Sequence, residues 1–360
     1  MARLPDDAAL EALAATDPQR LYDLALTVGD NRALGKLSGL LADRETREAT
    51  DLAVRLAETR GEQAEGDAWR PLVRRAAWQL VQRPSTAYLK PQFADRTPVS
   101  LDDPGTELRA CLLHEMALRH GVTDEVYLAY AAGLAELGHP LAWLPLDALY
   151  FEHTMRGGST MEGLMVGSFS PRELRACYPE VAPTAGGERA GRTARRLVDE
   201  ARARTAAEGF AELAVCEVAF YTLSEPLAAG DFNAALLAGL DAQCLEATDA
   251  ETITTVHTTA DDLASDLFSA AFGGGLWCQG RHGAYARLAA WRSLYALMGL
   301  DTQVPHRDAV RLAAEYRWLR FALAPYSENR WFFGDFTDTA FACLDPTRTV
   351  VGVIAATETD

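Results

Sequence analysis

The sequence predicts an α+β protein that is predominantly helical, with helical hairpins or a bundle in its N-terminal half and a smaller mixed α/β C-terminal half that ends in a β-hairpin. Three observations predict this class. Capped amphipathic segments follow one another up to about residue 153. Short segments rich in Val, Thr and aromatic residues appear only after residue 189. The C-terminal end has two apolar runs around an Asp-Pro turn.

The length of 360 residues exceeds the size at which one hydrophobic core usually divides, so two domains are expected, although one large domain remains an alternative. We expect a helical domain over 1–153, built as a bundle or a short α-solenoid. A loop or linker region over 154–188 and an α+β domain over 189–360 would follow. No repeat of fixed period distinguishes a solenoid from a bundle.

The N-terminal half carries one helix signal after another. Asp17 and Pro18 predict the N-cap and first residue of a helix through Thr27. Gly29 to Asn31 then separates this helix from a second one that ends near Asp43. Further helices are expected over the ranges 44–58, 67–82, 106–120, 123–137 with Thr123 as N-cap, and 141–151.

The C-terminal half mixes strand and helix signals. The Gly-, Ser- and Met-rich stretch 155–170 is expected to be a boundary or mobile loop. Strands are expected over 211–223, 253–258, 341–344 and 349–356, the last two as a hairpin. Helices are expected over 189–208, 259–272 with Thr259 as N-cap, and 284–298.

The composition limits the classes of partner that the protein is expected to bind. Acidic residues outnumber basic ones by 51 to 34, for a net charge of −17, which disfavours nucleic acid and anionic membrane surfaces. A basic protein or a small molecule fits this charge better. No apolar run is long enough to span a bilayer and the start has no signal-peptide core, so a cytoplasmic location is expected. The six cysteines lack metal or disulfide spacing, so we expect reduced thiols, no metal and no cofactor, and the oligomeric state stays open.

A glycine-rich loop before the predicted helix 284–298 is the first candidate site. Gly274 and Gly275 would offer backbone N–H groups, and Arg281, His282 and Arg287 would add cationic donors for an anion. The spacing matches neither the P-loop nor the dinucleotide fingerprint. The alternative is that the glycines only allow close packing between two helices.

Acid/base candidates are scattered. His257 precedes Asp261 at the start of the predicted helix 259–272, and His282 and Asp335 complete the candidate catalytic set. N-capping and a solvated helix face explain the first two residues with fewer assumptions. His114 and His120 lie six residues apart, which places them on different faces of a helix and excludes a zincin-type zinc site.

Two segments resemble a known family. Residues 285–294, YARLAAWRSL, are similar to a helix close to YGRLAAWRSL in an uncharacterised actinobacterial, streptomycete-type family of unknown function. The C-terminal VIAATETD resembles that family's last strand, close to LAVLAATDTD, and residues 139–145 also fit. Residues 185–260 and the surroundings of Cys278 depart from the pattern. The resemblance implies a bacterial origin of that type and assigns no activity.

Two functional hypotheses follow, and whether the protein is an enzyme stays open. The first is a cytoplasmic, non-catalytic interaction or regulatory protein, such as an immunity-like partner, because helical pairs and an acidic α/β part supply surface without recognisable chemistry. The second is an unfamiliar enzyme, such as a tailoring enzyme of secondary metabolism, with a pocket between the two halves.

Overall fold

The computed structural model describes residues 4–82, 86–149, 152, 166, 168–181, 194–228, 230–275, 278, 280–324, 329, 331–332 and 337–358. The chain groups into two compact units. Unit 1 is Met1–Ala148 with Arg281–Tyr285, and unit 2 is Leu149–Gly280 with Ala286–Asp360. The predicted class, α+β with a majority of helix, is confirmed. The predicted domain limits at 153 and 189 stay a prediction.

Unit 1 is built from helices that begin where the sequence supplies caps. Asp17 accepts from the backbone N–H of Arg20 ahead of Pro18, as predicted, and Thr46 caps the fourth helix. The helices are α1 (Asp7–Thr16), α2 (Pro18–Thr27), α3 (Asn31–Ala42), α4 (Arg47–Gln63), α5 (Trp69–Val81), α6 (Pro104–Arg119) and α7 (Glu125–Leu137), with 3-10 turns η1 (Gly66–Ala68), η2 (Thr86–Tyr88), η3 (Lys90–Gln92) and η4 (Pro140–Trp143).

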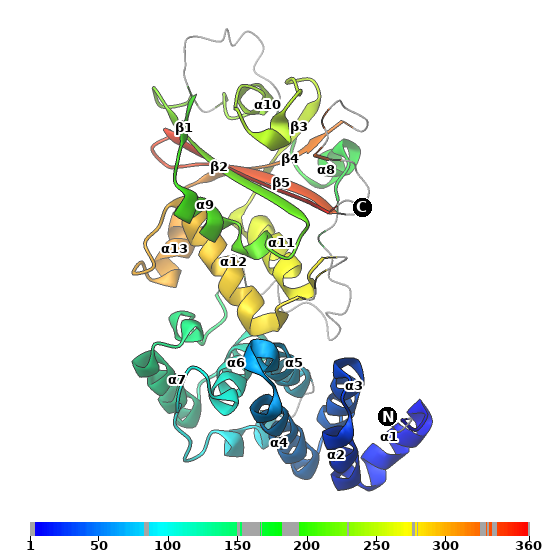
Figure 1. Cartoon of the computed structure of the whole chain (residues 1–360). Helices are drawn as coiled ribbons and strands as arrows, with labels where there is room; N and C mark the ends of the chain where they lie inside the picture. The colour runs from blue at the N-terminus through cyan, green and yellow to red at the C-terminus, as the bar shows by residue number, and fades with distance from the viewer. Residues whose placement is uncertain are drawn as a thin grey trace. The chain divides into compact units, whose positions relative to one another are not determined.

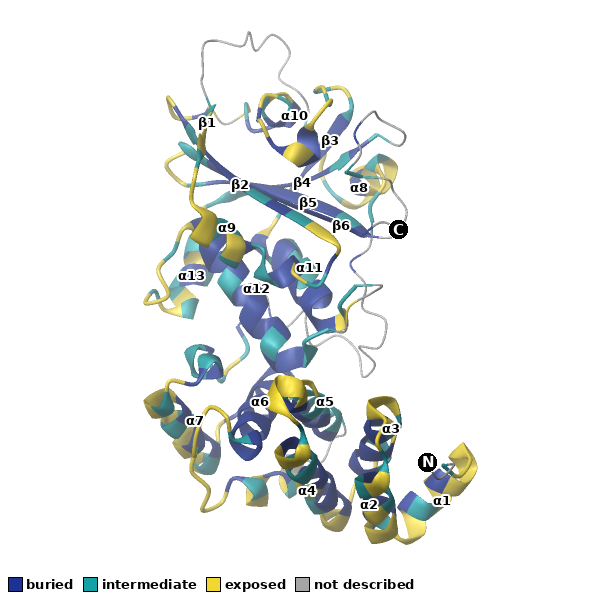
Figure 2. Ribbon diagram, in the orientation of Figure 1, coloured by how far each residue is buried: buried dark blue, intermediate teal, exposed yellow. Residues whose placement is uncertain are grey.

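Helix α6 is the most buried element of unit 1. All its residues from Pro104 to Leu118 are buried, although four of them carry charged side chains or imidazole groups. Figure 2 shows this helix almost entirely in the buried colour, next to α5. The polar groups of such a helix need internal partners.

Two predictions in this unit are wrong. Asp124, not Thr123, is the N-cap of α7, because its carboxylate accepts from the backbone N–H of Val126 at 3.1 Å. The helix predicted over 141–151 is only the 3-10 turn η4, followed by irregular chain to Leu149, and Tyr150 and Phe151 lie outside the described residues. Pro145 lacks an N–H and disfavours a helical Leu144, which ends the turn.

Unit 2 contains an antiparallel six-stranded sheet with the order β1-β2-β6-β5-β4-β3. Its strands are β1 (Ala194–Leu197), β2 (Val215–Leu223), β3 (Ile253–Thr258), β4 (Arg317–Leu323), β5 (Thr337–Leu344) and β6 (Val350–Glu358). Its helices are α8 (Pro171–Cys177), α9 (Glu200–Ala206), α10 (Ala234–Leu237), α11 (Ala260–Gly273), α12 from Ala286 on (the whole helix is His282–Met298) and α13 (His306–Ala313).

Helices cover both faces of the sheet. Figure 1 shows α10 on one face and α9, α11, α12 and α13 on the other. Side chains alternate along each strand accordingly: Tyr221 packs in the apolar cluster on the α10 side, whereas the neighbouring Phe220 ring meets the Arg202 guanidinium of α9 at 3.8 Å. The two faces therefore form two cores that share one sheet.

Most C-terminal predictions are confirmed. The hairpin is β5 and β6, Asp345 accepts from the N–H groups of Thr349 and Val350 in its turn, and Thr259 caps α11 through a capping box with Asp262. The helix predicted over 189–208 is wrong in part. Its described portion is the edge strand β1 followed by α9, because residues of the Arg-rich segment pair with β2. The stretch 155–170 lies mostly outside the described residues.

Deleting residues 346–360 should abolish cooperative unfolding of unit 2. Strand β6 lies between β2 and β5, so the deletion opens the sheet in its middle and removes the buried side chains of Val351, Val353 and Ile354. Each such side chain contributes about 2 kcal/mol, and a domain holds only about 5–15 kcal/mol in total. The cooperativity of unfolding is measured by near-UV circular dichroism during thermal denaturation.

The matched control is Arg348→Gly in the hairpin turn. Arg348 has φ +62°, a conformation that glycine adopts without strain, so this variant should keep or slightly raise the melting temperature. An unchanged denaturation curve for the deletion would contradict the strand order.

Candidate functional site

Two of the predicted acid/base residues of unit 2, His257 and Asp261, lie within the described chain. His257 is exposed on β3, and Asp261 lies half-buried in the first turn of α11, where burial and the neighbouring charge of Asp262 raise its pKa. Within the described part of the chain, no hydrogen bond or ion pair joins the His257 and Asp261 side chains. Asp335 lies outside the described residues. Their catalytic role stays a prediction without a shared geometry.

The loop glycines lie against other groups of unit 2. Gly274 ends α11 with φ +73°, and a Cβ placed on Gly275 would lie 2.1 Å from the carboxylate of Glu358. A Cβ on Gly280 would lie 1.8 Å from the carbonyl oxygen of Phe272. These contacts favour glycine at 275 and 280, but neither is a contact between two helices, so the anion-binding and helix-packing alternatives both stay predictions.

Arg287, a predicted anion ligand, is fully buried in unit 2 and binds an internal carboxylate. Its guanidinium forms two hydrogen bonds with Glu152, one of them at 2.8 Å, and the indole N–H of Trp291 donates to the same carboxylate at 2.9 Å. The anion at Arg287 is therefore Glu152, which a sequence separation of 135 residues hides from local patterns.

A second internal ion pair of unit 2 connects α11 to the sheet. Arg320 of β4 donates to Asp266 at 2.6 Å, and Thr339 of β5 donates to the same carboxylate at 2.8 Å. The guanidinium lies over the rings of Phe169 and Phe341 at 4.2 and 4.8 Å. This arginine is fully engaged by groups of its own unit.

His282 belongs to unit 1, where it begins α12 with φ +59°, a rare conformation for a residue other than glycine. Its ring stacks on Trp78 with centroids 5.8 Å apart. Burial, followed by the positive charges of Arg75 and Arg74, lowers its pKa to about 4. At neutral pH it is therefore an uncharged imidazole and not the cationic donor that the sequence suggested.

The buried carboxylate of Glu107 organises the polar interior of unit 1. Arg74 Nε donates to its Oε1 at 2.7 Å, while His139 Nε2 and the Tyr285 hydroxyl lie 3.1 and 3.2 Å from its Oε2. Burial raises its pKa, but the hydrogen bond from His139 and the charge of Arg74 outweigh this and hold the pKa below its usual value. Both oxygens are satisfied, so this carboxylate holds α5, α6, η4 and the start of α12 together.

Glu115 lies two turns further along the same face of α6 and is also buried. Its Oε1 accepts from the backbone N–H of Ala284 at 3.0 Å, and Arg119 lies 3.8 Å from its Oε2. A Cβ on Gly283 would lie 2.4 Å from this oxygen, so a larger residue there would displace the Glu115 carboxylate. Burial raises the pKa of Glu115 to about 7, against the opposing effect of Arg119 and the backbone N–H groups of Ala284 and Gly283.

Sequence reasoning missed this network. The available signal was the spacing of Glu107, Cys111 and Glu115, which fall four residues apart on one face of an otherwise apolar helix. Burial raises the pKa of the Cys111 thiol, which stays protonated between the two carboxylates. These groups lie inside unit 1 and are not presented to a substrate, and Glu115 Oε2 has no hydrogen-bond donor in the described structure.

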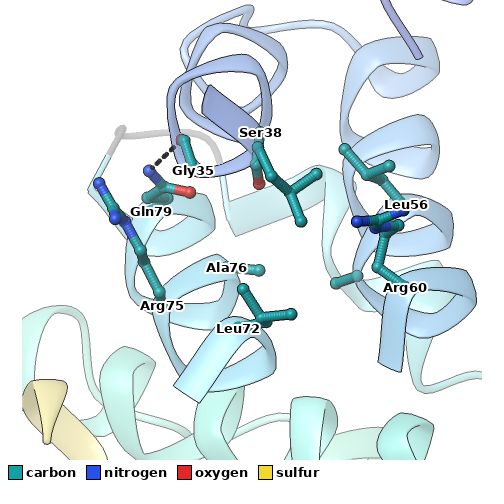
Figure 3. A pocket seen from close by; sticks show the side chains of 10 residues that line it. Gly35, Ser38, Leu56, Arg60, Leu72, Arg75, Ala76 and Gln79 are labelled. Carbon is teal, nitrogen blue, oxygen red and sulfur yellow. Dashed lines mark hydrogen bonds between the residues drawn. The ribbon is translucent and has the colours of Figure 1, made fainter. Parts of the chain in front are cut away.

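A small pocket that is open to solvent lies between α3, α4 and α5 of unit 1 (Figure 3). Its apolar wall consists of Leu34, Leu56, Ala57, Leu72 and Ala76. Its polar groups are Ser38, Arg60, Arg75 and Gln79. The pocket therefore combines an aliphatic surface with cations.

The two arginines of the pocket differ. Arg60 donates to the carbonyl oxygens of Leu26 and Val28 at 3.4 and 2.9 Å and so completes the end of α2. Arg75 lies across Gly35 of α3, where a Cβ would be 2.7 Å from the guanidinium carbon. No described residue accepts a hydrogen bond from Arg75 or forms an ion pair with it. This half-buried cation is available to an external anion.

Neither a metal cluster nor a membrane-spanning helix is found among the described residues. No three His, Cys, Asp or Glu side chains of the described chain are grouped so that they could hold a metal ion. Among the described helices, none has the length and apolar character that crossing a membrane requires.

Glu115→Gln should raise the free energy of unfolding at pH 8 by roughly 2–3 kcal/mol. Between the ordinary pKa of 4.5 and the folded value of about 7, the folded protein holds a proton that the unfolded chain has lost, so wild-type stability falls as pH rises through this window. The substituted amide would be neutral at every pH and still accept from the backbone N–H of Ala284. Urea denaturation at pH 4.5 and pH 8 measures the effect.

Glu107→Gln is the matched variant, for which we expect the opposite change in the free energy of unfolding. Because the pKa of Glu107 is depressed, its contribution is present above pH 4.5 and is lost as pH falls through the lower folded value. The variant should lose about 2 kcal/mol at pH 7, since Arg74 then lacks its carboxylate, and this difference should vanish as pH falls through the lowered folded pKa of Glu107. Equal pH profiles for both variants would contradict the assigned pKa directions.

Comparison with known proteins identifies the family of the chain. No curated protein and no solved structure matches the chain. A model described as a family of unknown function, DUF6183, matches residues 5–360, which is nearly the whole chain. The expectation of an uncharacterised family is thereby confirmed, and the chain belongs to the DUF6183 family of unknown function.

Proposed function

We propose that this chain is a cytoplasmic, non-catalytic interaction or regulatory protein, and that the pocket between α3, α4 and α5 binds its partner. The observation that carries the proposal is the environment of Arg75. This half-buried cation lies beside an aliphatic wall, and no described residue accepts a hydrogen bond from it or forms an ion pair with it. Solvating or pairing such a charge is favourable, and an anionic group of a partner supplies the missing interaction.

Three buried carboxylates are paired inside the protein, which supports a binding role for the unpaired Arg75. Glu107, Glu152 and Asp266 are each paired within their own unit, so these carboxylates act in folding. The six cysteines are all free, which fits the reducing cytoplasm. The net charge of −17 favours a partner that is basic over most of its surface, while the pocket takes an acidic group of that partner.

Site-specific photo-crosslinking in the native host tests this function. A photoreactive phenylalanine analogue replaces Leu72, which lines the pocket. In a control variant the analogue replaces Leu128, which is 45% exposed but lies on α7, away from the residues that line the pocket. We expect one protein adduct from position 72 and none of the same mass from position 128.

Adding Arg75→Gln should reduce the adduct at position 72 by about tenfold, as expected for the loss of one charge-assisted hydrogen bond. Arg47→Gln is the control, because Arg47 lies on α4 with a largely exposed side chain paired to Asp51. An adduct that forms equally at both positions, or that survives Arg75→Gln in a variant of unchanged melting temperature, would contradict the proposal.

A further inference from the structure

We infer that the pocket between α3, α4 and α5 binds the C-terminal residue of a partner chain, with its carboxylate on Arg75 and Ser38 and an aliphatic side chain on the apolar wall. This inference rests on the proposed function and adds the chemistry that the pocket recognises.

The first element of the site is the cation. Glycine at position 35 leaves room for the Arg75 guanidinium to lie against α3, where it lines the pocket. Its effect reaches His282, whose pKa it helps to lower. A carboxylate bound at Arg75 would reverse part of this effect.

The second element is a pair of polar groups without partners. Ser38 is 8% exposed, and no described residue hydrogen-bonds to its hydroxyl, although a serine inside a helix commonly donates to the carbonyl four residues earlier. Figure 3 shows its side chain among the pocket residues. The hydroxyl can therefore donate to a bound carboxylate.

Gln79 supplies the complementary acceptor. Its Nε2 donates to the carbonyl oxygen of Gly35 at 3.0 Å, which fixes the orientation of the amide. Its Oε1 is buried and lacks a donor in the described structure. An unsatisfied buried acceptor is unfavourable, so a ligand N–H that reaches it as the pocket side chains shift would bind more tightly.

These groups match the end of a polypeptide. A C-terminal residue presents a carboxylate to Arg75 and Ser38, a backbone N–H to Gln79, and a side chain to the wall formed by Leu56 and Leu72. A free aliphatic acid lacks the N–H, and inorganic phosphate lacks both the N–H and the apolar group. The pocket is small and open to solvent, so the chain that precedes the last residue continues outside it.

The test uses the full chain and N-acetylated tetrapeptides that end in alanine, valine, leucine or methionine, each as the free acid and as the C-terminal amide. Binding is followed by the side-chain amide resonance of Gln79 in 1H–15N spectra. We expect a valine or leucine acid to shift this resonance and the matching amide to bind about tenfold more weakly, because it lacks the charge. Isovalerate should also bind at least about tenfold more weakly, because it cannot donate to Gln79.

Arg75→Gln should reduce the affinity of the acid peptides to that of the amides, whereas Arg47→Gln should not change it. The inference is overturned if acid and amide bind equally, if isovalerate matches the peptides, or if no acid peptide binds. Should the peptides fail while the crosslink at position 72 still depends on Arg75, the partner binds by another anionic group. In that case the proposed function stands and the carboxylate assignment falls.

Discussion

The ion pair between Arg74 and the buried carboxylate of Glu107, at 2.7 Å, is the interaction on which the interior of unit 1 depends. A charge inside an apolar helix is costly unless all its hydrogen-bonding positions are filled. His139 and Tyr285 fill the remaining positions from two segments distant in sequence. The residues 281–285 are thereby part of unit 1, although the rest of α12 belongs to unit 2.

Unit 2 follows the same principle with different residues. Glu152 is paired with Arg287 and accepts from Trp291, and Asp266 is paired with Arg320 and accepts from Thr339. In each case the arginine is held by a carboxylate and, for Arg320, by two aromatic rings. Arg75 differs from these arginines because it lies against Gly35 and forms no ion pair with a described residue. The proposed binding function depends on that difference.

The sequence predicted local structure well where short-range chemistry decides it. The caps at Asp17 and Thr259 act within three residues, and the turn at Asp345 joins two strands that are neighbours in the chain. Strand β1 was missed because an Arg-rich segment looks the same as a solvated helix face until β2 is present to pair with it. The helix predicted after Leu141 failed because Pro145 outweighs the apolar pattern.

The candidate site could not be predicted in the same way. Tyr285 and Glu107 are separated by 178 residues, and Arg75 meets Gly35 across a stretch of sequence that includes all of α4. No local pattern distinguishes an arginine that will be paired, such as Arg74, from its neighbour Arg75, which will not. The side on which each guanidinium lies is decided only when α3, α5 and α6 pack.

The most direct measurement is the exchange of the arginine Nε–H protons with water in the free protein at pH 7, recorded by 15N NMR with resonances assigned by substitution. We predict slow exchange for Arg74, whose Nε donates to Glu107, and fast exchange for Arg75 that slows when a carboxylate-ended peptide is added. Equal protection of Arg74 and Arg75 in the free protein would show that Arg75 already has an internal partner, and it would contradict the central claim.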